Sequence, residues 1–310
     1  MRRLPLLAAL LAALIAAPAC GAAPAAEPLE TLVHDGRTRT ALVHDYSRGR
    51  KAPLVLVLHG AGGNAEITAR MTRFDEVARR EGLIVAYPNG TGRFADRFLT
   101  WNAGHCCAYA FREQVDDLGY LSALIDRLVA TRSVDPSRVY VTGLSNGGMM
   151  AHRAGIFLSD KVAAIAPVIG AVFGDEPSPK RPVPALIVVG ADDRIMPGAG
   201  GMPGAGLSLP GGRASEAADR PIAPARAQAD YWAKADGCRT EAVREEPSAT
   251  VTTHGGCRGG AEVRFYVVKD NGHAWPGGEA ARPEADRPTQ AFDATEVIWD
   301  FFRRHRLPAR

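Results

Sequence analysis

Short, continuous apolar runs recur along the chain, and stretches with helical spacing of apolar residues lie between them. Each run has the length and the Val, Ile and Leu content of a strand that is buried on both faces of a mostly parallel sheet. The runs are residues 54–58, 83–87, 139–142, 162–168, 185–189 and 263–268. Because strands that alternate with helices form right-handed βαβ units, the pattern predicts an α/β fold with a doubly wound sheet and helices on both faces.

Two of the intervening stretches have the apolar spacing of amphipathic helices. Residues 67–80 place Met71, Phe74 and Val77 among charged residues. Residues 115–129 carry leucine and isoleucine at intervals of three and four. Both stretches are therefore predicted to be helices that pack one apolar face against the sheet.

Two other segments depart from this alternation. Residues 31–46 precede the first buried run, and we expect them to add antiparallel strands at one edge of the sheet. Residues 197–224 are rich in Gly, Pro and Ala and contain almost no large apolar residue. A loop of this length is usually functional or disordered, so the segment is either a lid over a site or a disordered surface insertion.

The run at residues 139–142 leads directly into Gly143-Leu144-Ser145-Asn146-Gly147, which has the pattern G-x-S-x-G. Residues 148–158, which follow, are compatible with a helix. A strand, a tight turn and a helix in this order form the nucleophile elbow of α/β-hydrolases, where glycines allow close packing and a strained serine projects from the sheet edge. The pattern predicts that Ser145 is a nucleophile; the alternative is a Gly/Ser turn that leads into a core helix.

A serine nucleophile needs a general base, and on this fold the residues follow one another as Ser, then Asp or Glu, then His. Sites in open α/β sheets lie at the carboxyl ends of the strands. His273 follows the carboxyl end of the run at 263–268, whereas His254 precedes that run and His305 lies in a basic tail. We therefore predict that His273 is the base.

The base in turn needs a carboxylate that fixes its tautomer and stabilises the imidazolium. Asp192 and Asp193 directly follow the run at 185–189, at the sheet edge where the site is expected. Asp175, which follows the run at 162–168, is a weaker candidate.

The oxyanion that forms during acyl transfer needs two backbone N–H donors. One is expected from Asn146, the residue after the nucleophile. The second is expected from Ala61 in the loop His59-Gly60-Ala61-Gly62-Gly63, because the glycines let backbone donors approach a substrate. The alternative for this loop is a plain connection between a strand and a helix.

These motifs resemble those of a secreted esterase family that includes polyhydroxybutyrate depolymerases, feruloyl esterases and acetylxylan esterases. The matching stretches are residues 58–63, 101–107, 115–117, 134–140, the turn around Ser145 and Gly272-His273-Ala274-Trp275-Pro276-Gly277. The resemblance implies that the acid is Asp193, in Gly190-Ala191-Asp192-Asp193. The chain departs from the family at Ala191, where Thr is usual, and in the segment after Pro197, which leaves the substrate open.

The resemblance also implies the chemistry, which is hydrolysis of a carboxylic ester through an acyl-enzyme. We expect His59, Trp101 and Trp275 to lie beside the substrate, although Trp275 could equally be a core residue. The candidate substrates are hydroxyalkanoate oligomers, feruloyl esters and acetylated xylan, and we favour short uncharged acyl esters that include hydroxybutyrate oligomers. Two other interpretations stay open, namely a non-catalytic envelope lipoprotein and a serine peptidase or acyltransferase with the same fold.

Residues 1–26 have the pattern of a secretory signal, in which two arginines precede an apolar run that is too short to span a membrane. Ala17-Pro18-Ala19 fits a cleavage site, and the cysteine that follows makes lipidation at Cys20 an alternative. We therefore expect a secreted or periplasmic protein that contacts the membrane only if it is lipidated. Residues 27–310 are long enough for one α/β domain.

The other four cysteines suit an oxidising compartment. Cys238 and Cys257 bracket a polar, turn-rich loop and are predicted to form one disulfide, whereas the adjacent Cys106 and Cys107 form either a vicinal disulfide or two thiols. No cysteine or histidine spacing indicates zinc, and we expect no cofactor. The formal net charge of +3 gives no electrostatic case for nucleic acid. We expect a monomer whose partner is an ester substrate.

Overall fold

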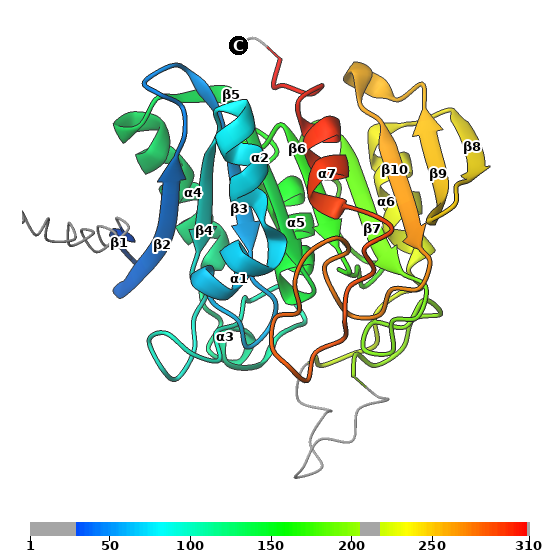
Figure 1. The fold of residues 1–310 in the computed structure, drawn as a ribbon, viewed down its shortest axis with the longest axis horizontal. Helices are drawn as coiled ribbons and strands as arrows, with labels where there is room; N and C mark the ends of the chain where they lie inside the picture. The colour runs from blue at the N-terminus through cyan, green and yellow to red at the C-terminus, as the bar shows by residue number, and fades with distance from the viewer. Residues whose placement is uncertain (1–28, 205–217, 309–310) are drawn as a thin grey trace, which may run out of the picture.

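The computed structural model describes residues 29–204 and 218–308. Within these residues ten strands form one sheet in the order β1-β2-β4-β3-β5-β6-β7-β10-β9-β8 (Figure 1). The strands are β1 (Leu29–His34), β2 (Arg37–Asp45), β3 (Ala52–Leu58), β4 (Ile84–Pro88), β5 (Val134–Leu144), β6 (Ala164–Val168), β7 (Ala185–Gly190), β8 (Thr240–Glu245), β9 (Ala249–Gly255) and β10 (Val263–Val268). The signal pattern of residues 1–26, with Cys20, lies outside the described residues.

The centre of the sheet is parallel, and both of its edges are antiparallel. Strands β4, β3, β5, β6, β7 and β10 pair in parallel. The antiparallel pair β1 and β2 extends one edge, and β9 and β8 extend the other. The predicted α/β fold with a doubly wound, mostly parallel sheet is therefore confirmed, as are the antiparallel strands expected between residues 31 and 46.

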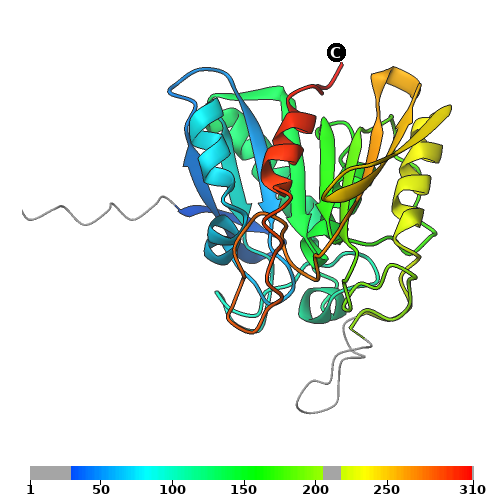
Figure 2. The same cartoon turned by 45° about the vertical axis from the view of Figure 1, so that its right-hand side comes forward.

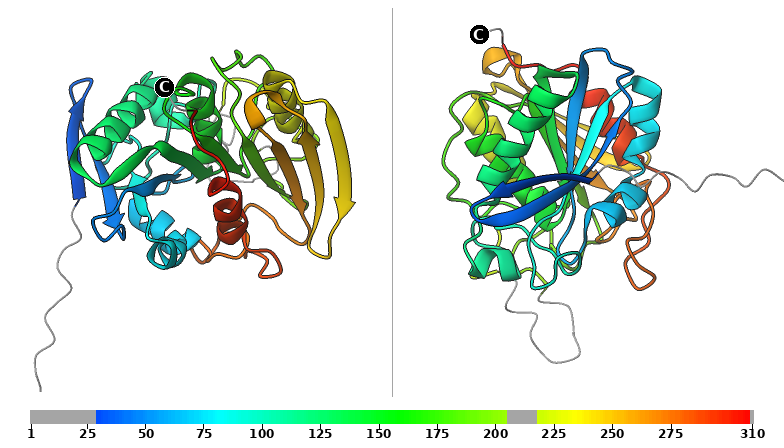
Figure 3. Two further views of the ribbon diagram at one scale, coloured as in Figure 1. Left: turned by 90° about the horizontal axis from the view of Figure 1, so that it is seen from above. Right: turned by 90° about the vertical axis from the view of Figure 1, so that its left-hand side faces the viewer.

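Helices cover both faces of this sheet, as the view from above shows (Figure 3). The helices are α1 (Ala65–Thr72), α2 (Phe74–Glu81), α3 (Ala108–Arg112), α4 (Asp117–Thr131), α5 (Asn146–Phe157), α6 (Arg226–Asp236) and α7 (Ala294–Phe302). Alternate residues of β3 point to opposite faces of the sheet. Val55 and Val57 belong to the core cluster that contains residues of α1, α2 and α7. Leu54 and Leu56 belong to the cluster that contains residues of α4, α5 and α6. A strand with two buried faces explains why its sequence is a continuous apolar run.

The predicted helix over residues 67–80 is two helices, because the chain turns at Arg73. Arg73 adopts the left-handed conformation (φ 53°), which ends α1. The carbonyl oxygens of Met71 and Thr72 accept hydrogen bonds from the Glu279 N–H and the Thr295 hydroxyl. These distant partners take the place of a continuing helix, and nothing in the local apolar spacing indicates them.

The prediction of a turn-rich loop between Cys238 and Cys257 is wrong. This segment forms the hairpin of β8 and β9. Every residue of β8 is exposed, so the strand lacks the alternation of buried and exposed residues by which an edge strand is usually recognised. Cys238 and Cys257 are joined by a disulfide, as predicted, and Cys106 and Cys107 form the vicinal disulfide that was one of two alternatives.

The Gly/Pro-rich segment 197–224 is anchored at the parts that the structure describes. Gly201 pairs with Ile222, and the side chains of Met196, Ala218 and Ile222 are buried. The alternatives of a lid and a disordered insertion concern residues 205–217, which lie outside the described residues.

Figure 2 shows the loops that follow β3, β4, β7 and β10 gathered at the lower edge of the sheet. This is the carboxyl edge of the parallel strands, where the predicted site residues are expected. No helix within residues 29–204 and 218–308 combines the length and hydropathy required to cross a bilayer.

Candidate active site

Ser145 occupies a strained turn between a central strand and a buried helix. β5 ends at Leu144 and α5 begins at Asn146, so the serine alone forms the connection, with φ 57° and ψ −119°. A residue with a side chain rarely adopts this conformation, and such strain gathers at functional sites. The Ser145 N–H donates to the Val168 carbonyl at the end of β6 (2.9 Å), which fixes the turn at the carboxyl edge of the sheet. The serine is partly exposed there.

The glycines on either side of Ser145 are required by close packing. A Cβ at Gly147 would lie 2.5 Å from the carbonyl oxygens of Leu58 and His59. A Cβ at Gly143 would lie 2.7 Å from the Gly147 carbonyl oxygen. The G-x-S-x-G pattern therefore lets α5 start directly against the end of β3.

His273 and Asp193 meet at the same edge of the sheet. Asp193 lies in the loop after β7 and His273 in the loop after β10, and these two strands pair in parallel. The distance between His273 Nδ1 and Asp193 Oδ2 is 2.9 Å. The other carboxylate oxygen of Asp193 accepts the N–H groups of Ile195 (2.8 Å) and Met196 (2.9 Å). The carboxylate is thus buried, oriented by its own loop, and directed at the imidazole.

Asp286 holds the backbone of the histidine loop, and the sequence pattern did not indicate it. One of its oxygens accepts the His273 N–H (2.7 Å). In the same loop Asn271 is fully buried and donates to the carbonyls of Gly272 and Ala274. Asp286 lies in a polar stretch without periodicity, so no signal could have separated it from surface acids.

The structure brings Ser145 to the same edge as His273 without a direct bond. Within the described part of the chain, no hydrogen bond joins the Ser145 hydroxyl to the imidazole. Catalytic hydrogen bonds are often long in the absence of substrate. What places Ser145 near the His273–Asp193 pair is that all three residues follow strands at the same edge of the sheet.

The glycine-rich loop after β3 lies against the elbow. A Cβ at Gly60 would lie 3.5 Å from the Cβ of Ser145. The Gly62 and Gly63 N–H groups donate to Leu99 and Gly60 carbonyls, whereas no acceptor among the described residues takes the Ala61 N–H. Asn146 is the first residue of α5, so its N–H has no carbonyl one turn earlier to bond. These two N–H groups are available to an oxyanion.

The expectation that His59, Trp101 and Trp275 line the substrate is corrected by their burial. The exposed fraction is 1% for His59 and 0% for both tryptophans. Each side chain has partners inside the protein: the Trp101 indole N–H donates to the His59 carbonyl, and the Trp275 indole N–H donates to the Thr295 hydroxyl. For Trp275 this is the core role that the sequence left open. Side chains with no exposed surface support the site from beneath.

His59 is a neutral support of the oxyanion loop. Its Nδ1 lies 2.8 Å from the Gly60 carbonyl oxygen, and its Nε2 accepts the Gly90 N–H (2.9 Å). These partners require a proton on Nδ1 alone. Burial lowers the pKa of His59 to about 4, which keeps the ring neutral near pH 7.

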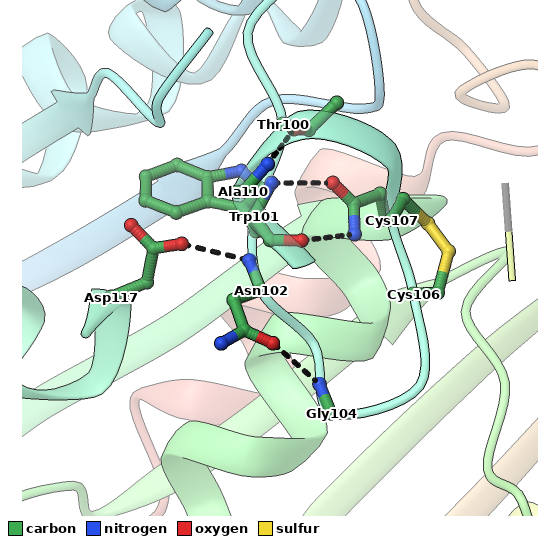
Figure 4. The surroundings of a disulfide bond; sticks show 9 residues. Thr100, Trp101, Asn102, Gly104, Cys106, Cys107, Ala110 and Asp117 are labelled. Atoms are coloured by element: carbon green, nitrogen blue, oxygen red, sulfur yellow. Dashed lines mark hydrogen bonds between the residues drawn. A yellow bond between two sulfur atoms is a disulfide. The ribbon is translucent and has the colours of Figure 1, made fainter. Parts of the chain in front are cut away.

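The vicinal disulfide flanks the same support (Figure 4). Trp101 is followed by a tight loop in which the Cys107 N–H donates to the Trp101 carbonyl (3.0 Å). Asn102 extends the loop by accepting the Gly104 N–H with its side chain and donating its own N–H to Asp117. The loop after β4 is thereby fixed on both sides of Trp101.

The remaining candidates lie away from Ser145, His273 and Asp193. Asp175 is exposed and pairs with Arg220. His254 pairs in β9 with Val263, at the amino end of β10, as expected of a residue on the wrong edge. His305 is hydrogen-bonded to Glu262 (3.2 Å). Asp192, the neighbour of Asp193, is exposed.

Comparison with known proteins shows the family of the chain. The model of the family described as "Esterase PHB depolymerase" matches residues 45–199. A putative esterase, NocK, from Nocardia uniformis subsp. tsuyamanensis is 31% identical over 263 residues, which are 80% of this chain and 73% of that protein. The chain belongs to the esterase PHB depolymerase family. The resemblance identified in the sequence is therefore confirmed.

Other relatives of the chain differ in name and in length. Feruloyl esterase B of Piromyces equi is 27% identical over 270 residues, which are 85% of this chain and 44% of that protein. A poly(3-hydroxybutyrate) depolymerase of Ralstonia pickettii is 34% identical over 126 residues, 37% of this chain and 24% of that protein. The chain thus spans less than half the length of either relative.

Solved structures support the fold. An acetyl xylan esterase from Aspergillus awamori superimposes with a TM-score of 0.53 at 13% identity, over 80% of this chain and 94% of that chain. A thermostable esterase gives a TM-score of 0.54 at 14% identity, over 90% of this chain and 63% of that chain. At this identity the likeness concerns the α/β-hydrolase fold alone.

Proposed function

We propose that this protein is an exported serine esterase that hydrolyses short-acyl carboxylic esters, including hydroxyalkanoate oligomers, through an acyl-enzyme on Ser145. One observation carries the proposal: the 2.9 Å contact between His273 Nδ1 and Asp193 Oδ2 at the edge where Ser145 holds its strained turn. Membership of an esterase family supports the same chemistry.

The proposed reaction begins with a proton transfer. Asp193 accepts from Nδ1 of His273, which leaves Nε2 free to take the Ser145 proton as Oγ attacks the ester carbonyl carbon. The imidazolium that forms is stabilised by the buried carboxylate. Collapse of the tetrahedral intermediate breaks the bond to the alkoxy group, which leaves with the proton from Nε2.

The developing negative charge needs donors that are already in place. The backbone N–H groups of Ala61 and Asn146 are proposed to bind the oxyanion, and the dipole of α5 adds a partial positive charge at its N-terminus. Water then attacks the acyl-enzyme, with His273 again as base, and releases the acid. Loss of one oxyanion donor typically lowers kcat about 10²–10³-fold.

Export is supported by two features of the sequence and structure. Residues 1–26 have the pattern of a secretory signal, and disulfides such as Cys238–Cys257 persist in oxidising compartments. Cell fractionation, with mass analysis of the mature N-terminus, tests this proposal and separates cleavage after Ala19 from lipidation of Cys20. A cytoplasmic protein with an intact leader would contradict export.

The substrate class is tested by comparing kcat/KM on three esters: hydroxybutyrate trimer, methyl ferulate and an acetylated xylo-oligomer. We expect the highest value on the trimer. A clear preference for methyl ferulate would instead assign feruloyl esters as the substrate class, in line with the names of some relatives. Inactivity on all three would contradict the proposed function.

A further inference from the structure

A cavity lies between α5, the loop after β4 and the segment after β6. Its volume is about 150 Å³. The wall contains apolar side chains, which include Ile156, Phe157 and Phe173, and the guanidinium of Arg153. Two histidines and the carboxylates of Asp175 and Glu176 complete its polar part.

Arg153 has no acceptor for any of its donors in the described part of the chain. It takes part in no hydrogen bond and no ion pair, and its Nε–H is buried without a partner. Its single polar contact is with the ring of Phe157, whose centroid lies 4.9 Å from Cζ. Buried donors are nearly always satisfied, so an arginine without an acceptor requires an explanation.

Neighbouring arginines show how unusual this state is. Arg181, which is buried to a similar degree, donates to the carbonyls of Ser159, Val162 and Pro182. Arg220, beside the same cavity, pairs with Asp175. The Nε–H of Arg220 is also buried without a partner, but Arg220 forms an ion pair, whereas Arg153 forms none among the described residues.

The acids in the cavity wall already have partners. Both carboxylate oxygens of Glu176 accept backbone N–H groups, from Phe173 and Gly174. Asp175 is held by Arg220. Burial lowers the pKa of Arg153, and Glu176 opposes that shift without pairing with the guanidinium. An anion that enters the cavity would therefore meet a guanidinium that neither Glu176 nor Asp175 pairs with directly.

The cavity and the turn at Ser145 share two elements, α5 and the end of β6 with the segment that follows it. Arg153 follows Ser145 by eight residues on α5, about 12 Å along the helix axis at 1.5 Å per residue. Long helical side chains lean toward the helix N-terminus, which here is the end at Ser145. Ala171 and Phe173 follow β6, the strand whose Val168 carbonyl holds the Ser145 N–H.

We propose that Arg153 binds the free terminal carboxylate of a linear hydroxyalkanoate oligomer while an ester bond of the same molecule lies at Ser145. The inference rests on the proposed esterase function and narrows its substrate. An unpaired guanidinium beside apolar side chains fits a carboxylate on a short aliphatic body. The inference revises the expectation of an uncharged substrate.

The test compares two esters that differ only in that carboxylate. The ratio of kcat/KM for linear hydroxybutyrate trimer to kcat/KM for its methyl ester is measured in the wild type and in Arg153→Met, which keeps the apolar stem. We expect a ratio well above one in the wild type and a fall of roughly tenfold or more in the variant, the range of a lost charged hydrogen bond.

Two further variants distinguish binding of the carboxylate by Arg153 from long-range attraction between the substrate and positive charge on the protein. Arg93→Met removes an exposed arginine from a loop at the same edge and is expected to leave the ratio unchanged. Arg153→Lys keeps the charge without the planar fork and should recover part of the ratio. An equal fall in Arg93→Met would overturn the inference, since long-range attraction would then explain the preference.

The outcomes distinguish this inference from the proposed function. Turnover of p-nitrophenyl butyrate and of both trimers, with a ratio that Arg153→Met does not change, overturns the inference and leaves the esterase standing. Absence of all turnover overturns both. If Arg153→Met does not fold, inhibition of the wild type by 3-hydroxybutyrate is compared with inhibition by its primary amide, which is neutral and not an ester. Stronger inhibition by the acid supports the pocket, and equal inhibition overturns it.

Discussion

The side chain of Asn146 and the backbone of Trp101 form a reciprocal pair of hydrogen bonds. Asn146 Oδ1 accepts the Trp101 N–H (2.7 Å), and Asn146 Nδ2 donates to the Trp101 carbonyl (3.1 Å). The Trp101 indole in turn donates to the His59 carbonyl (3.0 Å). The residue after the proposed nucleophile is thereby connected to the oxyanion loop, so the two proposed oxyanion donors are positioned relative to each other by one network.

Removal of the indole donor should disturb this network. Trp101→Phe leaves the buried His59 carbonyl without its donor, and we expect a loss of about 1–3 kcal/mol in the free energy of unfolding. Because the oxyanion loop loses a support, kcat on p-nitrophenyl butyrate should fall roughly tenfold while KM changes little. Steady-state kinetics and chemical denaturation measure the two effects.

Trp232→Phe is the matched control for this variant. Trp232 is also fully buried and donates to a buried partner, His152 Nδ1 (2.9 Å), away from the oxyanion loop. It should lose similar stability and keep its kcat. Equal losses of kcat in both variants would show that general destabilisation, and not the position of the oxyanion loop, controls turnover.

Asp286 is predicted to position the base through the backbone. Asp286→Ala removes the acceptor of the His273 N–H, and we expect kcat to fall about tenfold, the equivalent of one hydrogen bond. Asp286→Asn keeps a carbonyl oxygen at the same place and should retain most of the activity. If the Asn variant is as impaired as the Ala variant, the charge of Asp286 matters and the proposed backbone role is wrong.

The parts of the site that follow from local chemistry were predictable from the sequence. Gly143, Ser145 and Gly147 lie within one turn, and their packing is a property of that turn. The order of triad residues and the carboxyl edge of a parallel sheet restrict the base to His273. They leave more than one aspartate as the acid, and Asp193 was predicted only from the family resemblance.

The supporting contacts depend on how distant loops meet. Trp101 and Asn146 are 45 positions apart, and a tryptophan in a loop carries no mark that separates a buried support from a substrate contact. The apolar spacing of the sequence did not indicate the break at Arg73, because contacts with distant segments determine it. It did not indicate β8 either, because this exposed strand is determined by pairing at the edge of the sheet.

A buried carboxyl should make the stability depend on pH. Asp236 is fully buried, with one oxygen on the Val183 N–H and the other without a partner. Burial raises its pKa to about 7, against the effects of Val183, Arg181 and Arg258. Its unfolded pKa is about 3.9, so the folded state binds more protons between these values. This group therefore lowers the stability as pH rises from about 4 to 7.

Asp236→Asn removes this titration. We expect the stability of the variant relative to the wild type to increase from pH 5 to pH 8, as measured by chemical denaturation at both values. Asp96→Asn, at a largely exposed acid, should show no such increase. A difference between Asp236→Asn and the wild type that is independent of pH would contradict the raised pKa.

The central claim is that Ser145 is a nucleophile activated by His273. It is tested most directly by mass spectrometry after reaction with a fluorophosphonate, in the wild type, in Ser145→Ala and in Ser137→Ala, a control at the other end of β5. We predict one covalent adduct on Ser145 in the wild type and the control, none in Ser145→Ala, and a loss of ester turnover of at least about 10⁴-fold in that variant. An unlabelled wild type, an adduct on another residue, or turnover that survives in Ser145→Ala would contradict the claim.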